Sequence, residues 1–355
     1  MLGKFNLRDN MARKIKIDRK TDDCEKTLAS YFQSGNLNFL IGSGASMPAI
    51  SVAGNIEADI NKQIVEGKED NADLIALNFI EDIEDVNEDI IADIVDGNIK
   101  TTLSSYVAFL KNIDRILFER KNSLLSRQAN LFTTNYDMFF ERSADELSGF
   151  ILNDGFDRAT GLTDSFRFSP EKYFDRTYRS GSVYNHQAEV PTFNLIKLHG
   201  SLSWKKKDGH GILFDPTSPK GLTEADKTRP FKVREALKQR ALILPNIRKF
   251  QSTLLERVYF DLLRLFSNAL ERENALLIAF GFSFEDEHIL DLTRRALRNP
   301  TAQLIIFSYS ADGASKYEEK FAQQRNVLII APPDDANLSF AEFNKILDMI
   351  SSEAN

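Results

Sequence analysis

Four short segments of the sequence place glycine and polar side chains directly after apolar runs, where a ligand could meet them. These segments are Gly42-Ser43-Gly44-Ala45-Ser46, Asn135-Tyr136-Asp137, His199-Gly200-Ser201 and Gly281-Phe282-Ser283-Phe284-Glu285-Asp286. Small residues allow a backbone to approach a phosphate, and the free N–H groups at the start of a following helix favour an anion. The first segment is therefore a candidate phosphate-binding loop, with an ordinary strand-to-helix turn as the alternative.

The glycine spacing of this loop differs from the two common phosphate-binding motifs. A dinucleotide fingerprint has a third glycine three residues after the second. In this sequence the second glycine is Gly44, and the residue three positions later is Met47. The acidic residue that binds ribose should end a second strand about 20 residues further on, where this sequence has a helical pattern instead. No Gly-Lys-Ser/Thr follows, so the loop is not a Walker motif either. The sequence thus indicates a nucleotide site of another type.

Three polar residues in the second and third segments are the catalytic candidates. His199 is one of four histidines and the only one that directly follows an apolar run. An imidazole exchanges a proton near neutral pH, so His199 is a candidate general base, with a purely structural histidine as the alternative. The amide of Asn135 both donates and accepts, which suits it to orient a water, and Asp137 can stabilise positive charge or fix a neighbouring group.

Six apolar runs have the length and composition of strands, and four of them precede the candidate segments. The runs are Leu37–Ile41, Asn130–Thr134, Phe193–Leu198, Leu276–Phe280, Leu304–Phe307 and Val327–Ile330. None alternates cleanly between apolar and polar residues, which is typical of strands buried on both faces. Helical patterns separate several of them, at Ser252–Glu271, Glu285–Leu297 and Ala314–Gln323. This alternation predicts an α/β fold with a Rossmann-like parallel sheet, which binds its ligand at the carboxyl ends of the strands.

The rest of the chain predicts additions to this sheet. Residues 1–30 are basic and weakly periodic, which indicates an N-terminal extension ahead of one Rossmann-like domain over residues 31–355. Within that domain we predict a helical insertion at about residues 51–128 and an irregular lobe at about residues 141–192.

Much of the negative charge lies in one segment of the insertion. Between Glu66 and Asn98 there are twelve acidic residues and one lysine, a local charge of −11. We interpret this segment as one helix with a solvated acidic face, or as a docking surface for a basic partner such as the Arg229–Arg240 segment of a second copy. Helical periodicity continues from Thr101 to Gln128. The apolar residues recur with the spacing of one helix face, at Ile80, Ile83, Val86, Ile90 and Ile94.

Composition excludes several classes of protein. The 355 residues include 45 Lys and Arg against 52 Asp and Glu, and the net charge of −7 disfavours direct binding of nucleic acid. Hydrophobic residues make up 42%, with 27 Phe, which excludes wholesale disorder. Cys24 is the only cysteine, so neither an intrachain disulfide nor a Cys-rich zinc site can form. Because the longest apolar run, Ala275–Phe282, is strand-sized and the N-terminus has no signal-peptide pattern, we predict a soluble cytoplasmic protein without a membrane segment.

In this order and spacing, the segments resemble the motif set of the sirtuin superfamily, and in particular the sirtuin-like NAD-hydrolysing effectors of bacterial antiphage defence. The resemblance covers about residues 35–330 and includes Thr133-Thr134-Asn135-Tyr136-Asp137 and Lys197-Leu198-His199-Gly200-Ser201. It implies that Asn135 and Asp137 lie by the nicotinamide and its ribose, and that His199 contacts the ribose hydroxyls as general base. It also implies that the pyrophosphate of NAD⁺ lies on Gly42, Ser43, Gly44, Ala45 and Ser46, and its adenosine side on Gly281 and Ser283.

Two departures from the family narrow what the resemblance implies. Protein deacylases of this family carry four zinc-binding cysteines and a Gly-Ile-Pro-Asp-Phe-Arg run, where this sequence has Cys24 alone and Met47-Pro48-Ala49-Ile50-Ser51-Val52. We therefore predict an NAD⁺ glycohydrolase that releases nicotinamide and ADP-ribose without zinc or another metal, and that depletes NAD⁺ in antiphage defence. The alternatives are a catalytically silent module that senses NAD⁺ or ADP-ribose, and a zinc-independent NAD-dependent deacylase.

The resemblance also bears on partners. An enzyme that destroys NAD⁺ should be kept idle until it is triggered, and larger defence relatives carry sensor domains for which this chain has little room. We predict control by a separate protein, an ATPase of the HerA type, and assembly of the chain into a homo-oligomer.

Overall fold

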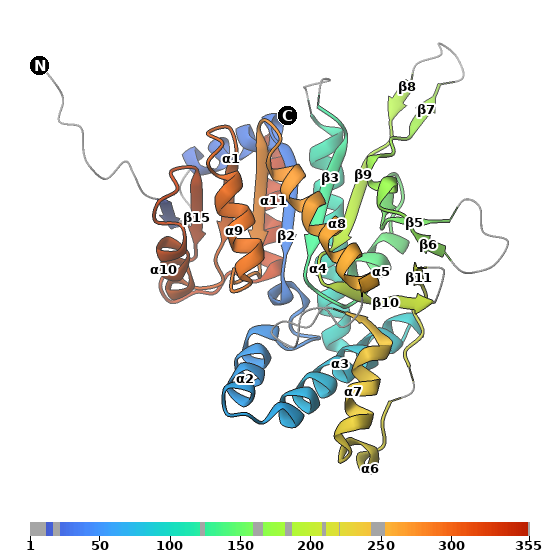
Figure 1. The fold of residues 1–355 in the computed structure, drawn as a ribbon. Coiled ribbons are helices and arrows are strands. Elements are labelled where there is room, and N and C mark those ends of the chain that lie inside the picture. Colours follow the sequence, from blue (N-terminus) through green and yellow to red (C-terminus); the bar gives the residue numbers. More distant parts are fainter. Residues whose placement is uncertain are drawn as a thin grey trace, which may run out of the picture.

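The computed structural model describes residues 12–16, 22–120, 125–158, 166–181, 187–207, 211–219, 221–242 and 253–353. Its centre is an eight-stranded sheet in the order β1-β15-β14-β13-β2-β3-β9-β4, with parallel pairing between neighbours (Figure 1). The predicted α/β fold with a Rossmann-like parallel sheet is thus confirmed. In chain order the strands of this sheet are β1 (Arg13–Lys16), β2 (Asn36–Ile41), β3 (Gln128–Thr133), β4 (Ile151–Asn153), β9 (Thr192–Lys197), β13 (Ala275–Phe280), β14 (Gln303–Phe307) and β15 (Val327–Ala331).

Helices cover both faces of this sheet. Phe39 and Ile41 of β2 pack into one core with α1, α4 and α11, whereas Leu40 between them packs into a second core with α8, α9 and α10. Successive side chains of a strand point to opposite faces, so the buried runs without polar alternation form the middle of three layers. The helices are α1 (Asp22–Ser34), α2 (Ala53–Val65), α3 (Glu69–Ile91), α4 (Gly97–Phe118), α5 (Phe139–Asp145), α6 (Glu224–Lys227), α7 (Pro230–Gln239), α8 (Thr253–Leu270), α9 (Glu287–Ala296), α10 (Ala311–Lys320) and α11 (Phe340–Glu353).

The six predicted strands are confirmed to within two residues at each end, as β2, β3, β9, β13, β14 and β15. The predicted helices over residues 252–271, 285–297 and 314–323 correspond to α8, α9 and α10. The helix predicted from Thr101 to Gln128 is wrong in its last turns, because α4 ends at Phe118. The guanidinium of Arg120 donates to the carbonyl oxygens of Phe32 (3.1 Å) and Gly35 (2.6 Å). These bonds anchor the residues that follow α4 beside the start of β2.

The acidic segment contains a helix, a turn and the start of a second helix, so the prediction of one helix is wrong. α3 ends at Ile91, and the carboxylate of Asp96 starts α4 by accepting a hydrogen bond from the N–H of Ile99 (2.7 Å). Most of the apolar stripe is buried or half-buried in the chain's own core, whereas Ile94 lies in the turn and is 59% exposed. The stripe therefore needs no partner to cover it.

The basic segment after residue 220 meets this acidic helix within the same chain. Helix α7 packs against α3, and α3 forms ion pairs with residues of α6, of α7 and of β12. In Figure 1 helices α2, α3, α6 and α7 form one lobe below the main sheet. The ion pairs are Arg234 with Asp70 (2.6 Å) and Asp73 (2.9 Å), Lys227 with Glu81 (2.9 Å), and the buried pair Arg240 with Glu84 (2.6 Å).

Residues 141–192 contain the end of α5 and several short strands. One of them, β4, extends the main sheet beside β9, whereas β5 and β6 join a separate five-stranded antiparallel sheet in the order β12-β10-β11-β6-β5. The indole of Trp204 is buried in that sheet against the rings of Phe156 and Phe168. The remaining elements are β5 (Phe156–Asp157), β6 (Phe166–Phe168), β7 (Tyr178–Ser180), β8 (Gln187–Glu189), β10 (Gly200–Lys207), β11 (Gly211–Phe214) and β12 (Arg240–Leu242), with 3-10 turns at Ser43–Ser46 and Pro170–Phe174.

Four neighbouring strands end level with one another at one edge of the main sheet. Phe280 of β13 is the register partner of Ile41 of β2, Ile41 is that of Thr133 of β3, and Thr133 is that of Lys197 of β9. Each candidate segment starts one or two residues beyond one of these four. From β2 the chain continues to β3 on one side, and β13 joins β2 later from the other side, so the β2–β13 boundary is the topological switch point. Open α/β sheets bind their ligands at such a point.

Candidate functional site

The first and fourth segments form one cradle at the β2–β13 boundary. The N–H of Gly42 donates to the carbonyl oxygen of Phe280 (3.0 Å), and that of Gly44 to the carbonyl oxygen of Gly281 (3.1 Å). A Cβ atom on Gly44 would lie 2.8 Å from the Cα of Gly281, which itself has a left-handed φ of 65°. The contact between the two backbones therefore requires glycine on both sides, whether or not a ligand is bound.

The backbone N–H groups of this loop are largely occupied. Besides Gly42 and Gly44, the N–H of Ala45 donates to the carbonyl oxygen of Gly42 (3.0 Å). The hydroxyl of Ser43 accepts a hydrogen bond from the N–H of Ala53 (3.2 Å) and so holds the first residue of α2. The predicted phosphate loop is thus a shaped, small-residue surface with few free N–H donors.

The second segment binds directly to the first loop. The amide Nδ2 of Asn135 donates to the carbonyl oxygen of Gly42 (3.1 Å) and to the hydroxyl of Ser46 (3.0 Å). The Ser46 hydroxyl in turn donates to Oδ2 of Asp137 (2.7 Å) and lies 2.9 Å from the phenol oxygen of the fully buried Tyr106. Ser46, Asn135 and Asp137 are themselves buried, so this contact is shielded from solvent.

A buried lysine holds the same segment from the other side. The ammonium of Lys197, whose side chain is 2% exposed, donates to the carbonyl oxygen of Asp137 (2.6 Å) and to the hydroxyl of Ser201 (3.0 Å). It also lies 2.7 Å from Oε1 of Glu141. Burial raises the pKa of both Asp137 and Glu141, and the positive charge of Lys197 opposes that rise. We call Ser46, Tyr106, Asn135, Asp137, Glu141 and Lys197 the inner network.

Two acceptors of the inner network have no hydrogen-bond partner among the described residues, Oε2 of Glu141 and Oδ1 of Asn135, and Asn135 is the one whose side chain is bonded to the cradle. Both carboxylate oxygens of Asp137 are used, since Oδ1 accepts from the N–H of Phe139 (3.3 Å) and Oδ2 from Ser46. The Oδ1 of Asn135 is buried and has no hydrogen-bond partner among the described residues. Leaving a buried acceptor unpaired costs about 1–3 kcal/mol, so its retention indicates a place for a ligand or a water.

The third and fourth segments meet through a histidine–aspartate pair. The Nε2 of His199, which is 5% exposed, lies 3.0 Å from Oδ2 of Asp286. The other oxygen of Asp286 caps α9 by accepting from the N–H groups of His288 (2.9 Å) and Ile289 (3.1 Å), which fixes the carboxylate.

Helix α2 adds a second carboxyl group to this pair. Burial raises the pKa of Glu57, the charge of His199 opposes that rise, and Asp286 adds to it, so the three groups are within electrostatic reach of one another. We call Glu57, His199 and Asp286 the outer cluster. Burial also raises the pKa of Tyr136, with smaller contributions from Glu57 and Asp286, which places the phenol close to the same cluster.

The structure brings the predicted residues together in two groups. Asn135 and Asp137 join loop 42–46 in the inner network, whereas His199 contacts the fourth segment through Asp286. Gly281 lies in the cradle, and Ser283 is exposed on the turn beside it. The catalytic and binding roles of these residues stay predictions.

Sequence reasoning missed four residues that hold this site, namely Glu57, Tyr106, Glu141 and Lys197. Lys197 gave a usable signal, because a charge inside an otherwise apolar buried strand requires a partner. Tyr106 fitted the apolar face of a helix, so the sequence gave no signal that it contacts the site.

Two absences hold for the part of the chain that the structure describes. No helix there combines the length and apolar character needed to cross a bilayer. No group of three or more His, Cys, Asp or Glu side chains there is arranged to hold a metal ion. His186 and His210 lie outside the described residues.

The fold and the site define an α/β protein with a glycine-lined cradle at the switch point of a parallel sheet. A family model described as a SIR2-like domain matches residues 129–330, more than half of the chain, and the chain belongs to this family. The match runs from β3 to β15 and leaves out loop 42–46. The assignment of that loop to the candidate site therefore rests on its contacts with the matched segments. A solved structure described as a Sir2 homolog–NAD complex covers 98% of this chain and 99% of its own, with 13% identity and a TM-score of 0.46. A search of curated proteins found no match.

Proposed function

We propose that this chain binds NAD⁺ at the carboxyl edge of the main sheet and hydrolyses the glycosidic bond to give nicotinamide and ADP-ribose. The observation that carries the proposal is the unpaired Oδ1 of Asn135, a buried acceptor beside the glycine cradle at the switch point. Membership of the SIR2-like family supports NAD⁺ as the substrate, since three of the four segments that resemble sirtuin motifs lie within the matched residues.

The cradle and the inner network give the substrate its orientation. The pyrophosphate lies along residues 42–46 and 281–283, where Ser43, Gly44 and Gly281 are half-buried and Ser283 is exposed. The nicotinamide ribose lies towards Asn135. Because most N–H groups of the loop are already bonded, the loop contributes shape and the Ser43 hydroxyl more than a row of donors.

The leaving group supplies much of the driving force. The ring nitrogen of the nicotinamide in NAD⁺ is cationic, so the C1′–N bond breaks with its electron pair passing to that nitrogen, and the ribose acquires oxocarbenium character. The Oδ1 of Asn135 accepts a hydrogen bond from one O–H of a water and so orients it, and that proton stays on the oxygen as part of the new hydroxyl. The water oxygen adds to C1′, and its second proton passes to His199.

Asp286 prepares His199 for this step. When the Nε2–H of His199 donates to Asp286, Nδ1 keeps the lone pair that accepts the proton. The carboxyl groups of Asp286 and Glu57 then stabilise the positive charge that develops on the ribose and on the imidazole. Asp137 acts as a positioning residue, because its carboxylate is engaged with Ser46 and Phe139.

The direct test is the incubation of the chain with NAD⁺, followed by chromatography and mass spectrometry of the products. We expect nicotinamide and ADP-ribose in equal amounts. Asn135→Ala should lower the rate about 10²–10⁴-fold, because the water loses its positioning group. The matched control is Asn130→Ala, which removes another asparagine from the same part of the chain, away from the site: Asn130 pairs across the sheet with Asn38 and Asn194. Equal loss in both variants would contradict the assignment of Asn135.

The two alternative functions give different products. Binding of NAD⁺ or ADP-ribose without nicotinamide release would identify a sensing module. Deacetylated peptide that appears together with nicotinamide would identify a zinc-independent deacylase.

We further propose, on the resemblance alone, that this activity serves antiphage defence under the control of an ATPase of the HerA type, and that the chain forms a homo-oligomer. The residues to test are the exposed Asp82, Asp85 and Glu88 of α3, since Glu81 and Glu84 are paired within the chain. Reversal of all three to Lys should weaken assembly in light scattering without lowering the melting temperature. A monomer at every salt concentration from about 50 to about 500 mM would contradict the oligomer.

A further inference from the structure

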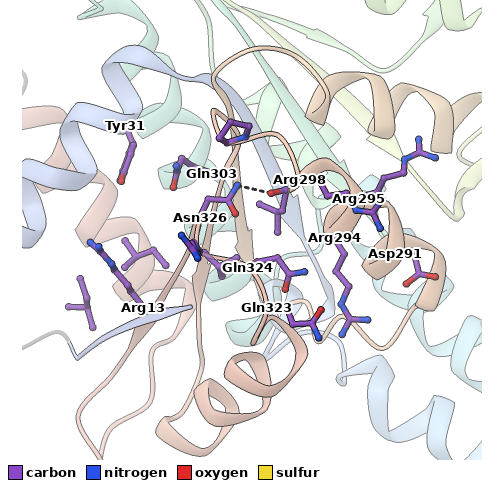
Figure 2. Close-up of a pocket in the computed structure, with 16 residues that line it drawn as sticks. Arg13, Tyr31, Asp291, Arg294, Arg295, Arg298, Gln303, Gln323, Gln324 and Asn326 are labelled. Atoms are coloured by element: carbon purple, nitrogen blue, oxygen red, sulfur yellow. Dashed lines mark hydrogen bonds between the residues drawn. The ribbon is translucent and has the colours of Figure 1, made fainter. Parts of the chain in front are cut away.

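A large cavity opens at the opposite edge of the main sheet from the site just described. It has a volume of about 1,090 Å³ and lies at the amino ends of β14 and β15, beside the last turn of α9 and the loop that follows α10. Figure 2 shows Tyr31 and Arg13 on one side of it and the arginines of α9 on the other, with Gln303 between them.

The lining of this cavity is strongly basic in a chain whose net charge is −7. Asp291 is the single acidic residue among the residues that line it. The basic residues that line it are Arg13, Arg294, Arg295, Arg298 and Arg325.

Two of these arginines have structural partners. Arg294 donates to the carbonyl oxygen of Lys320 (2.6 and 3.1 Å), where it caps the end of α10. Arg295 donates to the hydroxyl of Ser267 (3.0 Å) and to the carboxylate of Glu271 (2.9 Å). Cations at helix C-termini also offset the helix dipole, so this pair needs no ligand to explain it.

The other three arginines have no structural partners for their side chains. Arg13, Arg298 and Arg325 come from β1, from the turn after α9 and from the turn before β15, and their guanidinium groups form no hydrogen bond or ion pair with any described residue. Like charges gathered around one cavity repel one another, and a polyvalent anion removes that repulsion. A guanidinium also binds two phosphate oxygens at once, which makes arginine the side chain of choice for phosphate groups.

The remaining lining points to a nucleoside attached to the phosphates. The cavity is as large as the pockets that hold drug-sized ligands and cofactors, which are about 300–1,000 Å³. The side-chain amides of Gln303 and Gln324 line it without partners among the described residues and offer both donors and acceptors to a base edge. Tyr31 adds an aromatic ring for stacking. The amide of Asn326, by contrast, is used in the wall, since it donates to the carbonyl oxygens of Leu297 (3.1 Å) and Ala302 (2.6 Å).

We infer that this cavity is a second ligand site, which binds a nucleotide with two or more phosphates through Arg13, Arg298 and Arg325. The inference does not rest on the proposed NAD⁺ hydrolysis, because the two sites lie at opposite ends of the strands and share no residue. Binding here is measured without turnover.

The test is isothermal titration calorimetry of the full chain at low salt, with ATP, AMP and inorganic tripolyphosphate as probes. ATP should bind more tightly than either of the others, because only ATP supplies both the phosphates and the base. Arg298→Gln with Arg325→Gln should weaken ATP binding about 10- to 100-fold through the loss of two charge-assisted contacts. The matched control is Arg176→Gln with Arg179→Gln, which removes the same charge from exposed positions elsewhere and should leave ATP binding unchanged.

Several outcomes would overturn the inference. Equal weakening in the control would show that only net charge matters, and tripolyphosphate that binds as tightly as ATP would show a plain anion site. A single-stranded oligonucleotide that displaces ATP and binds more tightly would show a nucleic-acid surface. The side chains of Arg298 and Arg325 are exposed and unpaired, so the variant that carries both of these substitutions should melt at the wild-type temperature. If it does not, Arg13→Gln gives an independent variant. Nicotinamide release should be unchanged in all these variants, so failure of this site and failure of the proposed activity are distinguishable.

Discussion

The inner network and the outer cluster lie at the same edge of the sheet and differ in how their polar groups are held. In the inner network Ser46, Asp137 and Lys197 each contact at least two other groups, and solvent reaches almost none of them. The outer cluster is tied to the fold chiefly through Asp286, which joins His199 to the start of α9. Loss of an inner residue should therefore damage folding and activity together, whereas loss of His199, which does not cap a helix, should damage activity alone.

The largest effect that separates the two groups is expected in the outer cluster. His199→Gln removes the proposed base but keeps a polar side chain of similar size, so nicotinamide release should fall about 10²–10⁴-fold. The melting temperature should stay within a degree or two of the wild type. His288→Gln, an exposed residue on the first turn of α9, is the matched control and should change neither. Wild-type turnover by His199→Gln would remove this residue from the mechanism.

In the inner network the largest effect is expected at Lys197. Lys197→Met keeps the length of the side chain but leaves Glu141 and the carbonyl of Asp137 without their buried cation. Removal of one partner of a buried ion pair costs about 3–5 kcal/mol, so the free energy of unfolding in urea should fall by that amount and activity should fall with it. Lys316→Met, at an exposed position of α10, is the control. A stable but inactive Lys197→Met protein would instead place Lys197 in the chemistry.

The raised pKa values in the inner network predict a direction for stability against pH. Burial raises the pKa of Asp137 and Glu141 above their unfolded values, so the folded state holds a proton over a range in which the unfolded state has lost it. Their contribution to stability is complete below the ordinary carboxyl pKa and is lost as the pH rises through the raised values. Asp137→Asn should make this decline shallower in urea titrations between about pH 4 and 8. Asp145→Asn, at an exposed residue of α5, should not, and an equal change in both would contradict the assignment.

The sequence predicted the sheet and the strand ends that the candidate segments follow, because both depend on local patterns. Runs such as Leu276–Phe280 are apolar on both faces, which is enough to identify buried parallel strands, and glycine next to a strand end identifies a turn. The level register of the four strand ends then follows from the fold.

The inner network could not be predicted in the same way, because its partners are far apart in the sequence. Tyr106 reads as part of an apolar helix face until the fold brings it within 2.9 Å of Ser46, 60 residues away. The two-residue strand β5 carries no pattern of its own and is recognisable only through its pairing with β6. The ion pairs that α3 forms with Arg234 of α7 and with Arg240 of β12 join segments more than 140 residues apart. Charge patterning indicated that the acidic helix would meet basic residues, and only the fold shows that they belong to the same chain.

The smallest effect is expected at Arg234 of α7, for which the buried Arg240 of β12 is the comparison, since both residues pair with α3. Arg240 and Glu84 form a buried pair (2.6 and 2.8 Å), so Arg240→Met should lower the free energy of unfolding by about 3–5 kcal/mol, as at Lys197. Arg234 makes two ion pairs with α3 that are geometrically as good (2.6 and 2.9 Å), but its side chain is 41% exposed. Solvent screens such pairs, and Arg234→Met should leave urea unfolding nearly unchanged at about 150 mM salt. If Arg234→Met proved as destabilising as Arg240→Met, burial would not explain which ion pairs of this chain stabilise the fold.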